Sequence, residues 1–208
     1  MREGDAEIIG ILGMRGCGKS TLTHHLASDY PRKIVFDKLK EWDGTHIVRS
    51  LDEFKNIWRE IFHHESYTIV VHFAFGCGVE NIEVVASEIA RIVYLTGMES
   101  GLETCLIYEE AQFYFPLHAL SPVGFELLTT GRHARISVLW NTQRPASVNK
   151  LLVSQASQLF IGQLFEMRDV TYLTQSIGDV AQLASELPKL HFLHYQVGIR
   201  ETQIVDLT

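Results

Sequence analysis

Short apolar runs alternate with longer segments of mixed polarity along most of the chain. Six of these runs are rich in branched or aromatic residues, as expected of strands that are buried on both faces of a sheet. They span residues 6–12, 33–36, 67–75, 104–108, 136–141 and 158–162. Strand-like runs that alternate with helix-like segments predict an α/β fold with a mainly parallel central sheet flanked by helices.

Helix signals occupy the intervals between these strands. Ser50 and Glu53 have the spacing of a capping box ahead of the segment 54–62. The segment 79–96 is predicted to form a helix that ends at Gly97, because glycine favours the position that follows a helix.

The C-terminal segment 189–207 predicts two strands joined at Val197 and Gly198. Such an antiparallel hairpin could close one edge of the sheet. The chain has 208 residues, of which 46 % are hydrophobic, and it shows no internal repeat or linker. Residues 1–208 are therefore expected to form a single domain around one core.

No run reaches the roughly 18 apolar residues that a membrane span needs. The N-terminus MREGDAE is too acidic and too short to resemble a signal peptide. The sequence therefore predicts a soluble protein that is not secreted and has no intrinsic membrane span.

A glycine-rich motif, GMRGCGKS, occupies residues 13–20 directly after the first predicted strand. The pattern G-x-x-x-x-G-K-[ST] lets backbone N–H groups surround phosphate oxygens, and a helix predicted over residues 21–30 would point its N-terminus at the anion. Lys19 would reach the β- and γ-phosphates, and the Ser20 hydroxyl would bind Mg²⁺. The residues expected to bind the nucleotide are Gly13, Arg15, Gly16, Cys17, Gly18, Lys19, Ser20 and Thr21. The alternative is a glycine-rich turn that binds nothing.

Two carboxylates end the predicted strand 104–108. In a nucleotide site, Glu109 would hold the Mg²⁺ shell, and Glu110 would orient and deprotonate the attacking water. The alternative is that the pair begins a solvated helix. Aspartate is more usual at the metal position, and Glu109 is one methylene longer.

A polar cluster, Asn141, Thr142 and Gln143, ends the predicted strand 136–141. A polar side chain beside Glu110 can hydrogen-bond the γ-phosphate or the attacking water, and so can sense whether that phosphate is present.

These motifs resemble those of the FtsK–HerA superfamily of ring-forming, DNA-translocating ATPases. The segments GMRGCGKS, LIYEEAQ and GRHARISVLWNTQRP carry the resemblance, which covers residues 6–180. It implies a RecA/FtsK-like P-loop core that binds ATP and Mg²⁺. It also implies phosphate and metal contacts from Lys19 and Ser20, an acidic pair of Glu109 and Glu110, and a sensor at Gln143.

The same resemblance makes Arg132 the leading candidate for an arginine finger that enters the site of a neighbouring subunit. Arg135 and Arg144 are weaker candidates. Such a finger is worth about 10³ to 10⁵ in rate. The alternative is a surface arginine at the C-terminus of a helix, where a cation is favoured in any case.

The length of the chain points to one branch of the superfamily. A bare core of this size resembles the genome-packaging ATPases of membrane-containing icosahedral viruses, which drive double-stranded DNA into a capsid. The resemblance implies a ring of six or five copies, partners at the capsid vertex or among membrane-associated packaging proteins, and a place in the host cytoplasm or at the packaging vertex. The net charge of −7 and the absence of a basic run mean that few cations per subunit would contact DNA.

Other readings stay open. A filamentous-phage assembly or secretion ATPase of the zonula-occludens-toxin type would share the P-loop and the acidic strand. A small nucleotide kinase would need an arginine-rich lid, and a GTPase would need an N-K-x-D motif, whereas the Asn149-Lys150 pair continues as Leu-Leu. The non-enzymatic alternative is an assembly component that binds ATP and barely hydrolyses it.

Overall fold

The computed structural model of the chain describes residues 6–73, 78–199 and 201–208, and of residues 79 and 80 it describes the backbone alone. A nine-stranded sheet runs through the molecule in the order β3-β4-β2-β5-β6-β1-β7-β8-β9. The strands are β1 (Ile8–Leu12), β2 (Arg32–Asp37), β3 (His46–Val48), β4 (Tyr67–His72), β5 (Thr104–Tyr108), β6 (Ile136–Thr142), β7 (Gln158–Ile161), β8 (His191–Gln196) and β9 (Glu201–Asp206).

Strands β1 to β7 pair in parallel, and β8 and β9 pair antiparallel at one edge. The mainly parallel α/β fold, the six predicted strands and the C-terminal hairpin are therefore confirmed. The end of the predicted strand 67–75 lies partly outside the described residues. The short strand β3 was not predicted, because three residues carry too little pattern.

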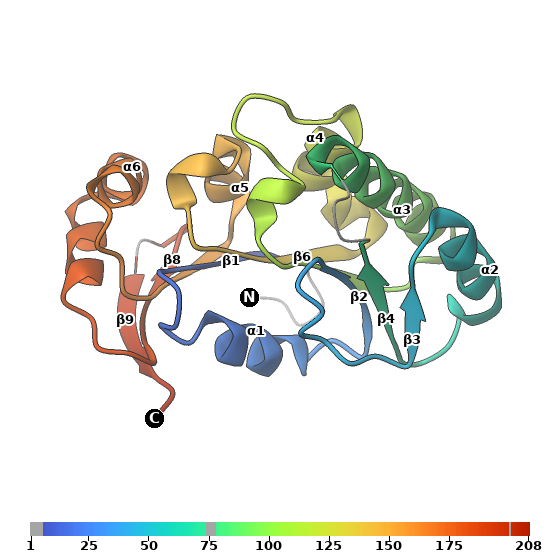
Figure 1. The fold of residues 1–208 in the computed structure, drawn as a ribbon, viewed down its shortest axis with the longest axis horizontal. Coiled ribbons are helices and arrows are strands. Elements are labelled where there is room, and N and C mark those ends of the chain that lie inside the picture. Colours follow the sequence, from blue (N-terminus) through green and yellow to red (C-terminus); the bar gives the residue numbers. More distant parts are fainter. Residues whose placement is uncertain (1–5, 74–77, 200) are drawn as a thin grey trace.

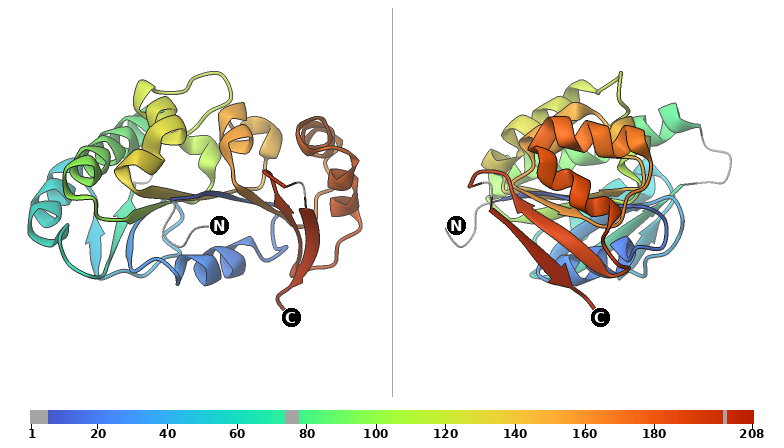
Figure 2. Two further views of the ribbon diagram at one scale, coloured as in Figure 1. Left: turned by 180° about the vertical axis from the view of Figure 1, so that it is seen from behind. Right: turned by 90° about the vertical axis from the view of Figure 1, so that its left-hand side faces the viewer.

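Helices cover both faces of the sheet (Figures 1 and 2). Helix α1 lies on one face, and α2 to α5 lie on the other, with α6 beyond them over the hairpin end. The helices are α1 (Lys19–Ala27), α2 (Leu51–Ile61), α3 (Val79–Ser100), α4 (Pro122–Thr130), α5 (Lys150–Gln155) and α6 (Met167–Ile177). None of these helices, nor any other in the described part of the chain, has the length and apolar character needed to cross a membrane.

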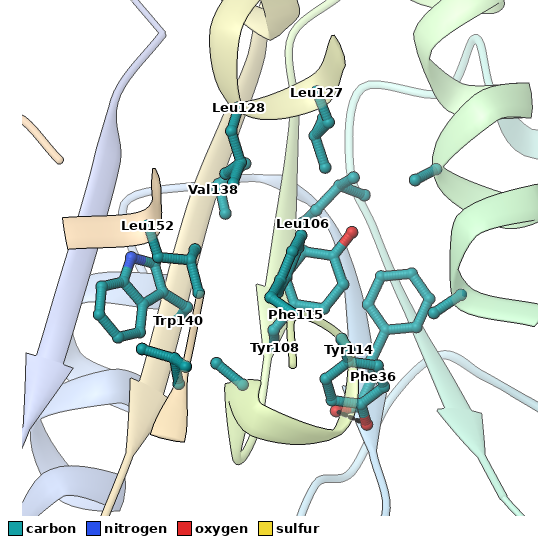
Figure 3. Packing of buried hydrophobic residues seen from close by; sticks show 14 of the residues in the cluster. Phe36, Leu106, Tyr108, Tyr114, Phe115, Leu127, Leu128, Val138, Trp140 and Leu152 are labelled. Carbon is teal, nitrogen blue, oxygen red and sulfur yellow. Dashed lines mark hydrogen bonds between the residues drawn. The ribbon is translucent and has the colours of Figure 1, made fainter. Parts of the chain in front are cut away.

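Two apolar clusters form the core, one on each face. Figure 3 shows the larger cluster, in which Trp140 of β6 lies beside Leu152 of α5 and Tyr108 of β5 lies among aromatic neighbours. The alternate residues Cys105 and Ile107 of β5 belong to the smaller cluster under α1. Burial of both faces explains why the central strands are continuous apolar runs rather than alternating ones.

Two local helix signals had different outcomes. The Ser50 side chain accepts a hydrogen bond from the Glu53 N–H (3.2 Å) and caps α2, as predicted. The predicted end of α3 at Gly97 is wrong, because the helix continues to Ser100 and is terminated by Gly101 in the left-handed region. A Cβ at Gly97 would lie 2.2 Å from the Ala134 carbonyl oxygen. Close packing, and not helix termination, requires a glycine at position 97.

Candidate nucleotide-binding site

The C-terminal ends of β1, β5 and β6 meet at one edge of the sheet. β6 lies between the other two strands, with Leu12 of β1 paired to Thr142 and Tyr108 of β5 paired to Trp140. The residue after Tyr108, Glu109, is therefore level with Asn141. Parallel pairing thus brings together the phosphate loop, the acidic pair and the polar cluster, three motifs far apart in the sequence.

The phosphate loop turns sharply from β1 into α1. Gly16 and Gly18 have φ angles of 80° and 109°, values that side chains rarely allow. A Cβ at Gly18 would also lie 2.6 Å from the Leu190 side chain. Helix α1 begins at Lys19, so its unpaired N–H groups and the positive end of its dipole face the mouth of the loop.

Lys19 is the buried cation of this loop. Its Nζ donates a hydrogen bond to the Met14 carbonyl (3.1 Å), and 7 % of the residue is exposed. Burial lowers the pKa of Lys19, and the negative charges of Glu110 and Glu109 act in the opposite direction. A lysine held this way is a close-range positive charge for an anion in the loop.

The predicted loop residues do not all face the same way. Arg15, Gly16, Gly18, Lys19, Ser20 and Thr21 line an open cleft of about 1040 Å³. Cys17 is turned inward and is 2 % exposed, and its carbonyl accepts a hydrogen bond from the Leu190 N–H (2.9 Å). Gly13 likewise lies behind the cleft, where its N–H donates to the Thr142 carbonyl (3.3 Å). Contact of Gly13 or Cys17 with a nucleotide stays a prediction about their backbone atoms.

The far wall of the cleft comes from the strand ends and two loops. It consists of Leu39, Glu41, Glu109, Glu110, Gln112, Phe113, Asn141, Gln143, Arg144, Lys189 and Leu190. The acidic pair therefore faces the phosphate loop across the same cleft, as a nucleotide site requires.

Glu109 is buried, and both of its oxygens are held. Oε1 accepts a hydrogen bond from the Trp42 indole N–H (2.8 Å), and Oε2 accepts one from the Asn141 amide. Burial raises the pKa of Glu109, and the hydrogen bonds from Asn141 and Trp42 lower it in part. With 5 % of the residue exposed, Glu109 does not begin a solvated helix.

Glu110 has a different set of partners. Its backbone lies in the left-handed region (φ 57°), and its N–H donates to Asn141 Oδ1 (3.0 Å). Its carboxylate accepts hydrogen bonds from the side chains of Gln143 and Gln112, the latter at 2.9 Å. Gln112 is in turn held by the Thr142 hydroxyl (2.7 Å). Asn141 thus touches both acids, and the predicted sensor Gln143 touches the predicted base directly.

Ser20 and Glu109 fit the binding of a magnesium ion. Mg²⁺ is usually held by one or two protein oxygens together with phosphate oxygens and waters. Ser20 and Glu109 border the same cleft. Each Glu109 oxygen accepts one hydrogen bond from the protein, and a carboxylate oxygen can accept about two, so both keep a lone pair.

The three candidate arginines lie in different places. Arg144 lines the cleft and forms an ion pair with Glu166. Arg135 forms an ion pair with Glu103 before β6. Arg132 is exposed in the 3₁₀ segment Gly131–Ala134, which also precedes β6. The seven residues of β6 rise about 3.3 Å each, so Arg132 lies about 20 Å from Gln143 of its own chain.

Several residues of the site were missed from the sequence. Trp42 contacts Glu109 across 67 positions, and Lys189 and Leu190 reach the cleft from the segment before β8. No local motif marks these residues. Gln112 was detectable, because it belongs to the segment LIYEEAQ and lies two residues after Glu110.

Comparison with known proteins gives structural matches only. No family model matches the sequence, and no curated protein matches it. The genome packaging NTPase B204 from Sulfolobus turreted icosahedral virus 2, solved with AMPPCP, superposes with a TM-score of 0.77 at 20 % identity, covering 98 % of each chain. VirB4 of Thermoanaerobacter pseudethanolicus gives a TM-score of 0.66 at 10 % identity, covering 96 % of this chain and 89 % of that one.

The N-terminal domain of zonular occludens toxin from Neisseria meningitidis gives a TM-score of 0.52 at 16 % identity, covering 98 % of this chain and 95 % of that one. These neighbours share a P-loop fold, which agrees with the resemblance in the motifs. Over nearly its whole length, the chain therefore has the fold of the genome packaging NTPase B204 and of VirB4.

Proposed function

We propose that this protein is an Mg²⁺-dependent ATPase that translocates double-stranded DNA, as a genome-packaging motor. The observation that carries the proposal is the arrangement of Glu109 and Glu110, both buried, across one cleft from the phosphate loop. Phosphoryl transfer needs a loop and helix N-terminus that hold the phosphates, together with carboxylates that bind the metal ion and orient the water, and this cleft brings the two sets of groups together.

The residues divide the chemistry between them. The loop N–H groups and Lys19 would hold the phosphates. Ser20 and Glu109 would hold the magnesium ion, which supplies charge neutralisation at the phosphates. Glu110 would orient the attacking water and take up its proton. Gln143, which donates a hydrogen bond to Glu110, is suitably placed to bridge this base and the γ-phosphate.

Action as a ring is part of the proposal. Arg132 lies about 20 Å from the site of its own chain, so a role as an arginine finger requires a neighbouring copy whose cleft it enters. Of the three candidates, Arg135 and Arg144 already have ion-pair partners within the described chain. A closed ring of six or five copies would present each finger to the next cleft.

The similarity to a genome packaging NTPase supports DNA as the second partner. A protein with net charge −7 would hold DNA through few cations per copy, repeated around the ring. Capsid-vertex or membrane-associated packaging proteins are proposed as further partners, and the host cytoplasm or the packaging vertex as the location.

The zonula-occludens-toxin type of assembly ATPase is the second candidate. Its domain superposes with a TM-score of 0.52, against 0.77 for the packaging NTPase, although both cover nearly the whole chain. The higher TM-score of the packaging NTPase favours the packaging motor over the assembly ATPase. A component that binds ATP without turnover is the non-enzymatic alternative.

The test is ATP hydrolysis with and without double-stranded DNA, with the oligomer mass measured in the same samples. Glu110→Gln is expected to abolish a DNA-stimulated rate, whereas the matched control Glu186→Gln, an exposed residue away from the cleft, should leave it unchanged. A slow rate of ATP hydrolysis that does not change when DNA is added, measured in a protein shown to be monomeric, would overturn the proposal of a DNA-translocating motor.

Mixing two inactive variants tests whether Arg132 acts as an arginine finger in the site of a neighbouring subunit. Arg132→Ala subunits keep their own Glu110, and Glu110→Gln subunits keep their own Arg132. A mixture that recovers part of the activity lost in each variant supports a finger acting between subunits. Mixtures as inactive as the separate variants, in a ring of proven mixed composition, would contradict it.

A further inference from the structure

Residues 38–42 fold back against the end of β2 around one buried carboxylate. Asp37, the last residue of β2, is fully buried. Its side chain accepts hydrogen bonds from the N–H groups of Leu39 (2.9 Å), Lys40 (2.7 Å) and Trp42 (2.8 Å). Three bonds to one side chain fix the path of this segment, and with it the position of Trp42.

The Trp42 side chain is held between α1 and the end of β5. Its ring stacks on His24 of α1, with ring centroids 3.8 Å apart and an interplanar angle of 27°. The residue is 6 % exposed, and its indole N–H donates to Glu109 Oε1 (2.8 Å). Backbone anchoring on one side and ring stacking on the other therefore direct a single hydrogen-bond donor at Glu109.

Glu109 has particular need of such a donor. A glutamate has one more rotatable bond than an aspartate, so its carboxylate is less well fixed by the backbone alone. Asn141 holds Oε2 and Trp42 holds Oε1, from opposite sides. The clamp fixes the longer side chain while one lone pair on each oxygen stays available.

We propose that Trp42 is the positioning residue of the metal site, which orients the Glu109 carboxylate for a divalent cation. This inference rests on the proposed function, because it assigns Glu109 to a nucleotide-bound magnesium ion. The segment that carries Trp42 also contributes Leu39 and Glu41 to the wall of the cleft. The contact of Trp42 with Glu109 thereby links the segment after β2 to the cation.

Trp42→Phe tests the inference, because phenylalanine retains an aromatic ring against His24 and lacks the N–H. The matched control is Trp58→Phe, which removes an indole N–H that donates to Thr96 (3.1 Å) between α2 and α3. The readout is the Mg²⁺ concentration that half-saturates binding of a fluorescent ATP analogue, followed by the same titration of ATP hydrolysis. Circular dichroism checks that each variant folds.

Loss of a residue that orients a metal ligand typically costs 10- to 100-fold in metal affinity. Trp42→Phe is therefore expected to raise the half-saturating Mg²⁺ about tenfold, with analogue binding in EDTA unchanged, while Trp58→Phe stays within about twofold of wild type. A Trp42→Phe value within twofold of wild type would overturn the inference.

A double-mutant cycle separates positioning from a general effect on the fold. Glu109→Asp shortens the side chain away from the indole, so adding Trp42→Phe to it should cost little more. Full additivity of the two losses would overturn the inference. Tryptophan emission gives a further check, and Trp140 remains in both single variants. An Mg²⁺-dependent change of fluorescence should persist in Trp58→Phe and disappear in Trp42→Phe, and its absence in Trp58→Phe would count against the assignment.

The outcomes distinguish this inference from the proposed function. A wild-type protein that binds the analogue in an Mg²⁺-dependent way and does not hydrolyse ATP would contradict the motor, while the binding titrations would still decide the role of Trp42. Wild-type binding that is indifferent to Mg²⁺ would overturn both.

Discussion

Asn141→Asp is the substitution that the geometry of the site makes most informative. Asn141 is 1 % exposed, and its amide donates to Glu109 Oε2 while its Oδ1 accepts the N–H of Glu110. The substitution keeps the size and the acceptor, and replaces the donor with a second carboxylate beside Glu109. Two buried carboxylates in contact cannot both stay ionised without a large penalty.

The magnitude follows from the distance between the charges. Two like charges about 4 Å apart at an effective dielectric constant of about 20 repel by about 4 kcal/mol. Near pH 5 this repulsion lowers the free energy of unfolding by at most about 1.5 kcal/mol, because protonating one carboxyl with an ordinary pKa of about 3.9 removes the repulsion at that cost. Repulsion between the introduced carboxylate and that of Glu109 raises the pKa at which this pair loses its last proton in the folded state. The stability that this proton provides is therefore present at low pH and is lost as the pH rises.

The assay is urea unfolding followed by circular dichroism at about pH 5 and about pH 8. Asn141→Asp is expected to lower the free energy of unfolding by about 4 kcal/mol at the higher pH and by at most about 1.5 kcal/mol at the lower one. Asn149→Asp is the matched control: Asn149 caps α5 through its Oδ1 and the Leu151 N–H (3.0 Å), and aspartate caps equally well. A loss for Asn141→Asp that is equal at both pH values would refute the reasoning.

The remaining predictions concern packing, orientation of the base and competition by protons. Gly97→Ala should lower the free energy of unfolding by about 3 kcal/mol, because its Cβ would meet the Ala134 carbonyl, whereas Gly78→Ala, whose Cβ would meet none of the described residues, should cost less than about 1 kcal/mol; equal losses in urea unfolding would contradict this. Gln112→Ala should slow single-turnover hydrolysis about tenfold with nucleotide affinity unchanged, since it removes a donor to Glu110, and a rate equal to that of the exposed control Gln182→Ala would exclude the role. Burial raises the pKa of Glu109, so the Mg²⁺ needed for half-maximal nucleotide binding should rise as the pH falls toward this raised pKa, and a rise no steeper than that of Glu109→Gln would argue against Glu109 as the metal ligand.

Much of the fold was accessible from the sequence, because its signals are local. Strands buried on both faces are continuous apolar runs, and the polar residues that follow them, such as Glu109 and Asn141, must meet at one sheet edge when the strands are parallel. The glycines of the phosphate loop were also predicted from their motif, and the positive φ angles of Gly16 and Gly18 explain why glycine is required there.

The sequence failed where a distant contact decides the role of a residue. Gly97 follows a helical segment and has the local character of a helix end, but its packing against Ala134 is what requires it. Trp42 was unrecognised because its partner Glu109 is 67 positions away, and nothing near it in the chain indicates a hydrogen bond to a metal ligand. A long-range contact made by one side chain leaves no periodic trace.

The central claim is that ATP hydrolysis at this cleft moves DNA. The most direct measurement is ATP-dependent displacement of a triplex-forming strand from double-stranded DNA, with wild type and Glu110→Gln compared at equal oligomer mass. The account predicts displacement by wild type with ATP and Mg²⁺, and none by Glu110→Gln, which still binds ATP. Hydrolysis by wild type without displacement, or displacement that survives in Glu110→Gln, would contradict it.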